Sequence, residues 1–192
     1  MQKCRVGTIL SWASSYLPRM GSSRLRTLVV KSCCDMATLY LMVGLPCSGK
    51  TTKAKELEGE LSALRLTPDE WQIRLFGQDA HDPEHDVRHS LIEAQLWKIA
   101  ERALVLGTSI ILDFGFWAKE EREDYRTRAQ AIGARSEIVF MDVGDEELLR
   151  RLTERNGRLT DTTFYISEEA MRGWIPFFQK PDNDELMARE IV

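Results

Sequence analysis

A glycine-rich segment, Gly44-Leu45-Pro46-Cys47-Ser48-Gly49-Lys50-Thr51, carries the residue types and spacing with the clearest chemistry in this sequence. It fits the pattern G-x-x-x-x-G-K-[ST] at every fixed position. The glycines allow a tight turn in which successive backbone N–H groups point into a phosphate-sized hollow. The lysine then reaches the β- and γ-phosphates, and the threonine hydroxyl ligates Mg²⁺. The segment, together with Thr52, therefore predicts a site for ATP, with Thr51 as a ligand of Mg²⁺.

The residues on either side of this loop suit the strand and the helix that such a site needs. Residues 38–43 are a short apolar run typical of a buried parallel strand, and residues 52–61 indicate a helix. The positive end of that helix dipole would face the phosphates. Strand, loop and helix in this order favour nucleotide binding over a glycine-rich turn without a ligand.

Two aspartates follow predicted strands at the sheet edge where ligands bind in parallel α/β proteins. Asp113 ends a strand at 108–113 and would hold a Mg²⁺-bound water, or cap the next turn. Asp69 follows a strand at 64–67 and would accept or orient the proton of an acceptor hydroxyl. Asp69 also suits the N-cap of the next helix, and the two roles are compatible.

Arginines gather near a polar loop at residues 158–166, which together with the helix before it suggests a lid at about 150–166. Arg151, Arg155 and Arg158 would share one face if the helix continued. Guanidinium groups from a lid would stabilise charge on a transferring phosphoryl group. Arg155 and Arg158, which flank Asn156-Gly157, are the best candidates; the alternative is a solvated helix surface.

Three histidines, His81, His85 and His89, are spaced by four residues. Pro83 interrupts the first pair, and a single helix offers only the other two, which is fewer ligands than zinc needs. We expect these histidines to lie at a solvated loop and helix edge near the acceptor site.

The remaining patterns predict further helices at 69–76, 86–106, 119–132 and 146–155, a last helix from 167, and a strand at 137–143. Strands alternating with helices imply a three-layer α/β/α fold of the P-loop NTPase type with a mostly parallel sheet. The sheet would have four strands, or five if residues 188–192 add one. A small helical lid would complete the domain.

Composition limits the class of protein. The hydrophobic content of 43% and the charged content of 29% are ordinary for a soluble protein, and no apolar run approaches the ~20 residues of a membrane span. Four cysteines without metal or disulfide spacing favour a reducing, cytoplasmic compartment. We expect a monomer or a homodimer with no membrane partner.

The first 35 residues differ from the rest. They are rich in serine, and the first 34 carry six basic side chains and no acid, as a mitochondrial transit peptide does. Met36 leads almost directly into the first strand, as a natural start would, and we favour that interpretation; the domain then spans 36–192. Residues 35–192 keep 20 of the 26 basic and all 30 acidic side chains, a net charge of −10 that argues against a broad nucleic-acid-binding surface.

With these residues in place, the segment from Met36 to about Phe178 resembles the small P-loop kinases of the AAA_33 type, which include polynucleotide kinase, zeta toxin, chloramphenicol phosphotransferase and gluconate kinase. The resemblance rests on the phosphate loop, on Thr67-Pro68-Asp69-Glu70-Trp71, on Asp113 and on Arg155-Asn156-Gly157-Arg158. It implies that Asp69 is a general base and that Arg155 and Arg158 contact the donor phosphates.

One segment departs from the family pattern. Polynucleotide kinase-like members have Asp-x-Thr-Asn where this chain has Asp113-Phe114-Gly115-Phe116-Trp117. The three aromatic side chains would line an acceptor pocket and stack on a ring, or pack into the core. We therefore expect an ATP- and Mg²⁺-dependent phosphotransferase with a small-molecule hydroxyl acceptor. A polynucleotide 5′-hydroxyl kinase and an ATPase or nucleotide-dependent switch are the alternatives.

Overall fold

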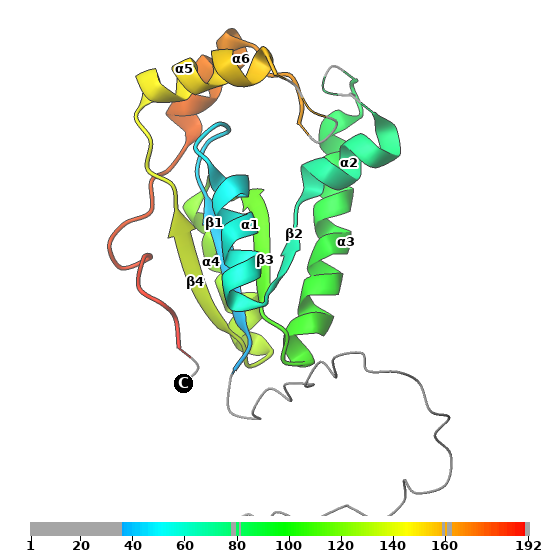
Figure 1. Cartoon of the computed structure of the whole chain (residues 1–192). Helices are drawn as coiled ribbons and strands as arrows, with labels where there is room; N and C mark the ends of the chain where they lie inside the picture. Colours follow the sequence, from blue (N-terminus) through cyan, green and yellow to red (C-terminus); the bar gives the residue numbers. More distant parts are fainter. Residues whose placement is uncertain (1–35, 78–79, 81, 159, 161–162, 191–192) are drawn as a thin grey trace, which may run out of the picture. The chain divides into compact units, whose positions relative to one another are not determined.

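A parallel sheet with the strand order β2-β3-β1-β4 forms the centre of the fold (Figure 1). The strands are β1 (Thr38–Val43), β2 (Leu64–Leu66), β3 (Ile110–Gly115) and β4 (Arg135–Phe140). The computed structural model describes residues 36–77, 80, 82–158, 160 and 163–190, all within one compact unit, Cys33–Val192. The predicted leader at 1–35 and His81 lie outside the described residues.

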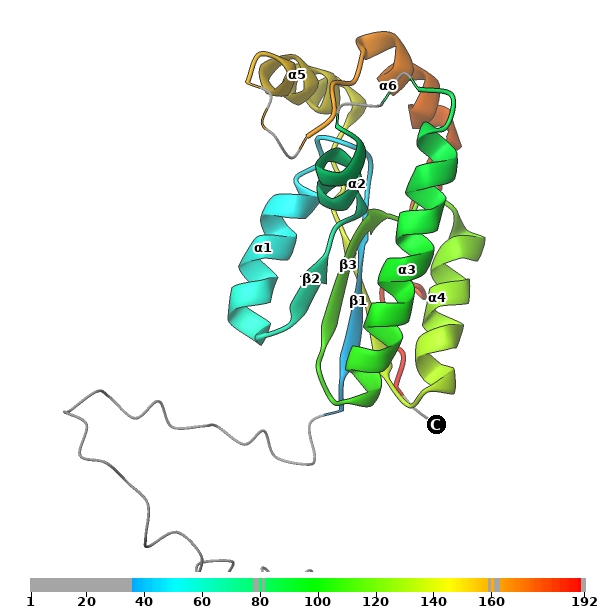
Figure 2. The same ribbon diagram turned by 90° about the vertical axis from the view of Figure 1, so that its right-hand side faces the viewer.

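Helices cover both faces of this sheet. Figures 1 and 2 show α1 (Lys50–Leu61) on one face, with α3 (His85–Val105) and α4 (Lys119–Ala131) on the other. The short α2 (Pro68–Phe76) packs against α3. Two further helices, α5 (Asp145–Asn156) and α6 (Glu168–Trp174), lie beyond the carboxyl ends of the strands and are followed by the 3₁₀ turn η1 (Ile175–Phe177). The predicted three-layer α/β/α architecture is confirmed; we call α5 and α6 the lid helices.

The two central strands, β1 and β3, are buried on both faces, which explains their continuous apolar runs. Because side chains alternate along a strand, Leu39 and Leu41 face the large core under α3 and α4, while Met42 faces the small core under α1. In β3, Leu112 likewise faces the large core and Ile111 faces the small core. Among the described residues, no helix combines the length and the apolar character that a membrane span needs.

Several boundaries differ from the sequence prediction. β3 continues to Gly115, two residues beyond Asp113, because Gly44 N–H donates to the Gly115 carbonyl and prolongs the pairing with β1. β4 begins and ends earlier than predicted, at Arg135 and Phe140. In the described part of the proposed fifth strand, Arg189 forms an isolated antiparallel bridge with Ser136, so the described sheet has four strands.

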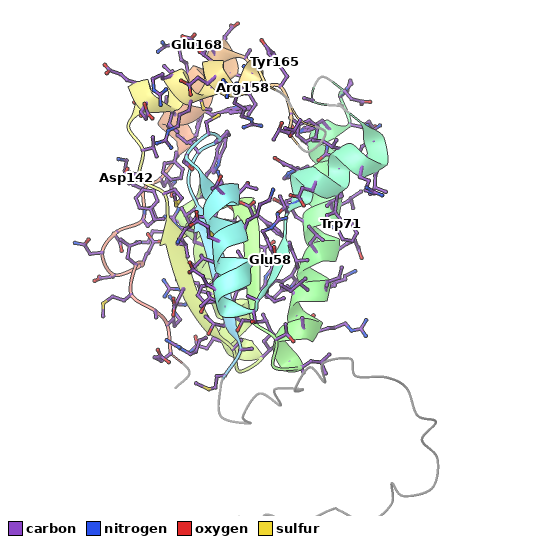
Figure 3. All side chains as sticks on the ribbon, in the orientation of Figure 1. Glu58, Trp71, Asp142, Arg158, Tyr165 and Glu168 are labelled. Atoms are coloured by element: carbon purple, nitrogen blue, oxygen red, sulfur yellow. The ribbon has the colours of Figure 1, made fainter. Side chains whose placement is uncertain are left out.

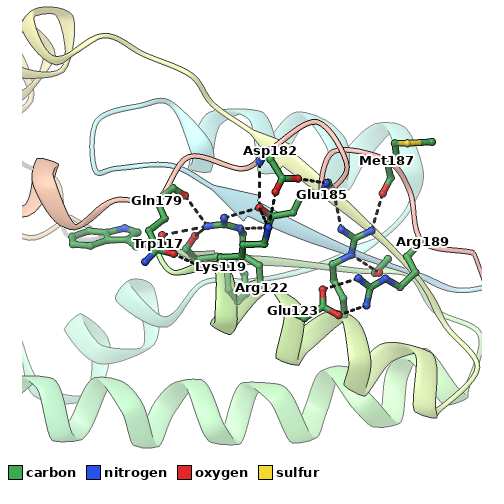
Figure 4. A network of polar contacts seen from close by, with 12 residues as sticks. Trp117, Lys119, Arg122, Glu123, Gln179, Asp182, Glu185, Met187 and Arg189 are labelled. Carbon is green, nitrogen blue, oxygen red and sulfur yellow. Dashed lines mark hydrogen bonds and ion pairs between the residues drawn. The ribbon is translucent and has the colours of Figure 1, made fainter.

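The segment after η1 is attached to α4 by buried arginines (Figure 4). Arg122 donates to the Glu185 carboxylate from Nε at 2.8 Å and from Nη2 at 3.1 Å. Arg126 donates to the carbonyls of Glu185 and Met187, each at 2.7 Å. The C-terminal segment is therefore fixed by polar contacts that a hydrophobic pattern does not reveal.

Candidate active site

The phosphate loop has the backbone geometry that its glycines predict. Gly44 has φ +149° and Gly49 has φ +100°, both in the region that favours glycine, and a Cβ on Gly44 would lie 2.7 Å from Ser48 Oγ. Lys53 N–H makes the first bond of α1, to the Gly49 carbonyl at 3.1 Å. The amides of Lys50, Thr51 and Thr52, which precede Lys53 in the first turn, have no acceptor within α1. These amides and the dipole of α1 suit a phosphate.

Lys50 sits in this loop with its ammonium group turned inward. Its Nζ donates to the Leu45 carbonyl at 2.8 Å. Burial lowers the pKa of Lys50 to about 8, although the charges of Asp113 and Asp69 oppose the shift. A cation that is already desolvated and held by a neutral carbonyl is well placed to pair with phosphate oxygens instead.

The lowered pKa of Lys50 predicts how ATP affinity depends on pH. Above about pH 8 the lysine of the unliganded protein loses its proton, so binding a phosphate then requires proton uptake. We expect the affinity for a non-hydrolysable ATP analogue to fall by up to about tenfold between pH 7 and pH 9, as linkage requires. Calorimetry on the wild type and on Lys50→Met checks this: the variant binds weakly and lacks the pH dependence. If affinity for the analogue changed with pH in the same way in both proteins, Lys50 would not be the group that takes up the proton.

Oxygen atoms for a magnesium ion lie beside this lysine. Asp113 is buried and accepts hydrogen bonds from the hydroxyls of Thr51 and, at 3.4 Å, of Thr67. Burial raises the pKa of Asp113, and the Thr51 hydrogen bond and the Lys50 charge oppose that rise. The described residues contain no cluster of three or more His, Cys, Asp or Glu side chains that would hold a metal ion. Thr51 and Asp113 nevertheless fit Mg²⁺, which takes one or two protein oxygens together with phosphate oxygens and water.

A cavity of about 1060 Å³ opens in front of the loop. The phosphate loop, α1, the ends of β2 and β3, α2, α3, α4 and the lid helices all contribute to its wall. Its basic residues are Lys50, Lys55, Arg151 and Arg155, from α1 and α5. Its carboxylates are Asp69, Glu70, Asp86, Asp113 and Glu121, from α2, α3, β3 and α4. The arginines of the cavity thus lie on the lid helix α5, Asp113 lies beside Lys50 at the loop, and α2, α3 and α4 form an acidic side.

Asp69 lies on the acidic side, in the first turn of α2. The N-cap of α2 is Thr67 and Pro68 occupies the first turn, so the interpretation of Asp69 as the N-cap is wrong. The Asp69 side chain is 47% exposed and its Oδ1 lies 3.3 Å from His89 Nε2. A half-exposed carboxylate that borders the cavity fits the predicted base position.

Two of the histidines are more ordered than the sequence suggests. His89 retains 25% exposure and lies between Asp69 and Glu93, and His85 Nδ1 contacts Gln72 Nε2 at 2.8 Å. Both border the cavity, as predicted, but they are held by hydrogen bonds rather than solvated. Glu93 was not predicted; its position four residues after His89 on a helix is the sequence signal that could have found it.

The two candidate lid arginines differ in position. Arg155 borders the cavity, donates to the Phe164 carbonyl at 3.0 Å and contacts Cys47 Sγ at 3.6 Å. Arg158, labelled in Figure 3, follows the lid helix α5, is exposed and is not among the described residues of the cavity wall. Arg151, the third of the set, donates to the Ser48 carbonyl at 3.3 Å. The lid therefore reaches the phosphate loop through Arg151 and Arg155.

The aromatic segment after Asp113 divides between the cavity and the core. Gly115 and Phe116 have positive φ, +107° and +46°, and this turn buries the Phe116 ring against Phe114 and Tyr125. Phe114 is half-buried at the cavity wall. Trp117, also at the wall, contacts Trp174 of α6 with ring centroids 5.6 Å apart. Both sequence interpretations thus apply: Phe116 belongs to the core and Phe114 packs against it, while all three aromatic side chains contribute to the cavity wall.

Comparison with known protein families places this geometry in context. The model of AAA_33, described as an AAA domain, matches residues 39–181. This range holds the loop, Asp69, Asp113 and both lid helices. No curated protein sequence shows significant similarity to the chain.

Solved structures share the fold at low sequence identity. A chain of the Pnkp1/Rnl/Hen1 RNA repair complex matches with a TM-score of 0.61 and 22% identity over 74% of this chain. Kti12 from Chaetomium thermophilum, solved with ADP-AlF₃, has a TM-score of 0.57 and 23% identity; 75% of this chain and 81% of Kti12 are covered. A sugar kinase from Janibacter sp. HTCC2649 has a TM-score of 0.55 and 16% identity, with 78% and 82% covered. This chain covers 44% of the RNA repair protein's length.

Proposed function

Because this chain belongs to the AAA_33 family, we propose that it is an ATP- and Mg²⁺-dependent kinase that transfers the γ-phosphoryl group to a hydroxyl of a small-molecule acceptor. The observation that carries this proposal is the position of Asp69 across a single cavity from Lys50 and Arg155. A proposed base for the acceptor hydroxyl, Asp69, and cations for the phosphates of ATP, Lys50 and Arg155, then border the same cavity, as phosphoryl transfer requires.

Each group has a distinct role in the proposed reaction. The amides of the loop and Lys50 bind the donor phosphates; Thr51 and Asp113 would hold Mg²⁺, which would neutralise charge on the phosphates. Asp69 accepts the proton of the acceptor hydroxyl. At the same time the hydroxyl oxygen of the acceptor bonds to the γ-phosphorus, and the bond between that phosphorus and the leaving oxygen of ADP breaks. Arg155 stabilises charge on the transferring group.

The charge distribution of the cavity supports a small acceptor over a nucleic acid. Proteins bind polynucleotides by neutralising several phosphates with lysine and arginine. The acceptor side here presents Asp69, Asp86 and Glu121 instead, and the aromatic rings of Phe114 and Trp117 border the same space. Such a wall suits an uncharged or cationic alcohol with an apolar face, and it repels phosphates beyond the one transferred.

We expect Arg155→Met to lower kcat by about 100-fold, because removing one donor to a developing anion has an effect of that size. The KM for ATP should change less. Steady-state kinetics at saturating ATP check this, with Arg158→Met as the comparison that tests the second predicted arginine. Equal rates for Arg155→Met and the wild type would remove Arg155 from the mechanism.

The experiment that tests the proposed function is incubation of the full chain with γ-labelled ATP, Mg²⁺ and separate acceptors: sugars, nucleosides, amino alcohols, antibiotics and a 5′-hydroxyl oligonucleotide. We expect label in a small alcohol. Label confined to the oligonucleotide would identify a polynucleotide kinase, and release of labelled phosphate with every acceptor would identify an ATPase or switch.

A further inference from the structure

Three side chains from two helices form a line at the acceptor side of the cavity. His89 Nε2 lies 3.3 Å from Asp69 Oδ1, and His89 Nδ1 lies 3.5 Å from Glu93 Oε1. His89 and Glu93 lie one turn apart on α3, while Asp69 comes from α2, which packs on α3. The imidazole therefore bridges the proposed base and a second carboxylate that lies deeper, with 23% exposure.

We propose that His89 is a positioning residue that donates a hydrogen bond from Nε2 to Asp69 Oδ1, and that Glu93 holds His89 in the protonation state this requires. The inference rests on the proposed function, because it gives Asp69 its orientation for the acceptor hydroxyl. One oxygen of Asp69 is then fixed by His89 and the other is presented to the acceptor. Asp69 alone takes the proton in the transfer step.

The bridge works fully only while the pair His89–Glu93 holds one proton beyond the single N–H of the neutral imidazole. With the imidazole cationic and Glu93 ionised, both ring nitrogens donate. With the imidazole neutral and Glu93 protonated, Glu93 donates to Nδ1 and Nε2 still donates to Asp69. When that proton leaves, the neutral imidazole keeps a single N–H, for which the carboxylates of Glu93 and Asp69 compete, so Asp69 has its donor for only part of the time.

The surroundings keep that proton in place near neutral pH. Burial alone would lower the pKa of His89, but the Asp69 hydrogen bond and the charges of Glu93 and Asp86 outweigh it and raise the pKa above its ordinary value. Burial raises the pKa of Glu93 to about 7; the charge of His89 opposes this, and those of Glu121 and Asp69 reinforce it. Burial raises the pKa of the Tyr125 phenol, on α4, to about 12, and the nearby charge of Glu93 adds to that rise. The two groups therefore titrate as a coupled pair.

This arrangement predicts a basic limb in the rate. As the pH rises above the pKa at which the pair releases its additional proton, Asp69 has its donor for only part of the time and kcat falls. In Glu93→Gln the neutral amide can donate to Nδ1 at any pH, so that limb should disappear. Deprotonation of Lys50 would give a different limb, one that Glu93→Gln leaves in place. Glu101→Gln, an exposed change on the same helix, is the matched control and should keep the wild-type profile.

The first test needs no acceptor. Imidazole ¹⁵N NMR of the full chain follows His89 through a pH titration. We expect the wild-type pKa to lie above 6.5, to fall in Asp69→Asn and in Glu93→Gln, and to stay unchanged in Glu101→Gln. A His89 that titrates identically in all four proteins overturns the bridge.

The second test separates positioning from mere structure. We expect His89→Ala to lower kcat by up to about 100-fold, the cost of misplacing a reacting group, with the KM for ATP within about twofold of the wild type. His89→Gln, whose amide can donate near the Nε2 position, should recover most of the rate and show no basic limb from the pair. The readout is ATP turnover with the acceptor that the labelling panel identifies, or with water if none is labelled.

The outcomes distinguish this inference from the proposed function. A wild-type protein that consumes no ATP overturns the kinase and the positioning role together. A wild-type kinase with normal kcat in His89→Ala, or with equal losses in His89→Ala and His89→Gln, overturns the positioning role alone.

Discussion

Replacing Asp69 with asparagine is expected to lower kcat for phosphoryl transfer by about 10²- to 10⁴-fold, the range for a positioned general base. The change keeps the shape of the side chain and removes its capacity to take a proton. ATP affinity should change little, because the loop amides and Lys50 bind the phosphates. Single-turnover transfer and separate binding of an ATP analogue give the two measurements.

Asp86→Asn is the matched control for this prediction. Asp86 also borders the cavity, and its charge also acts on His89, so its removal reproduces the electrostatic part of the change without touching the base. At saturating acceptor we expect a change of less than about threefold in kcat, since exposed charges act weakly through water, and any part of Asp86 in acceptor binding should change the KM for the acceptor instead. Normal transfer by Asp69→Asn would show that Asp69 is not the base and would strengthen the ATPase or switch alternative.

The parts of the site that the sequence predicts are those built from local chemistry. The loop requires two glycines, a lysine and a threonine at fixed spacing, so Gly44 to Thr51 are readable one by one. Asp113 follows from a strand that is apolar up to a carboxylate. The parallel sheet follows in turn, because each strand is separated from the next by a helix.

Contacts between distant segments are what the sequence pattern leaves out. No sequence pattern around Phe116 predicts the turn with two positive φ angles that buries its ring. The same pattern does not predict that Trp117, one residue later, remains at the cavity wall. The prediction that Arg155 and Arg158 share one face requires the helix to continue past both residues. In the structure α5 ends at Asn156, and Arg158 is exposed. His89 is predicted from the sequence to lie at a solvated helix edge, and its partners in the structure, Asp69 and Glu93, depend on how α2 packs on α3.

The same limit applies to Arg122, which helical periodicity cannot distinguish from a surface arginine. Its guanidinium is fully buried and also donates from Nη1 to the carbonyls of Phe116, Trp117 and Gln179, at 3.2, 3.2 and 2.9 Å (Figure 4). It therefore joins the C-terminal segment to the aromatic segment that borders the cavity.

We expect Arg122→Met to lower the free energy of unfolding by about 3 to 5 kcal/mol, because the buried Glu185 carboxylate loses its two guanidinium hydrogen bonds and keeps only the Asp182 N–H at 3.2 Å and Lys119 at 4.0 Å. The midpoint of thermal unfolding should fall by about 6 to 20 °C for a domain of this size. The double change Arg122→Met with Glu185→Leu should recover most of the loss, since no buried charge then remains. Arg150→Met, at an exposed ion pair with Glu147, is the surface control and should leave the midpoint unchanged.

Acid unfolding tests the ion pair of Arg122 and Glu185 independently, because the pair makes stability depend on pH in a known direction. Arg122 holds the pKa of Glu185 below its ordinary value, so the pair stabilises the fold above the unfolded-state pKa of about 4.5 and loses this contribution as the pH falls through the lower folded-state pKa. In Arg122→Met the buried carboxyl instead prefers its proton, and its pKa should rise above the ordinary value. The variant should then lose less stability than the wild type between pH 5 and pH 3. Parallel acid-unfolding curves would show that Glu185 finds another partner or reaches solvent once Arg122 is gone.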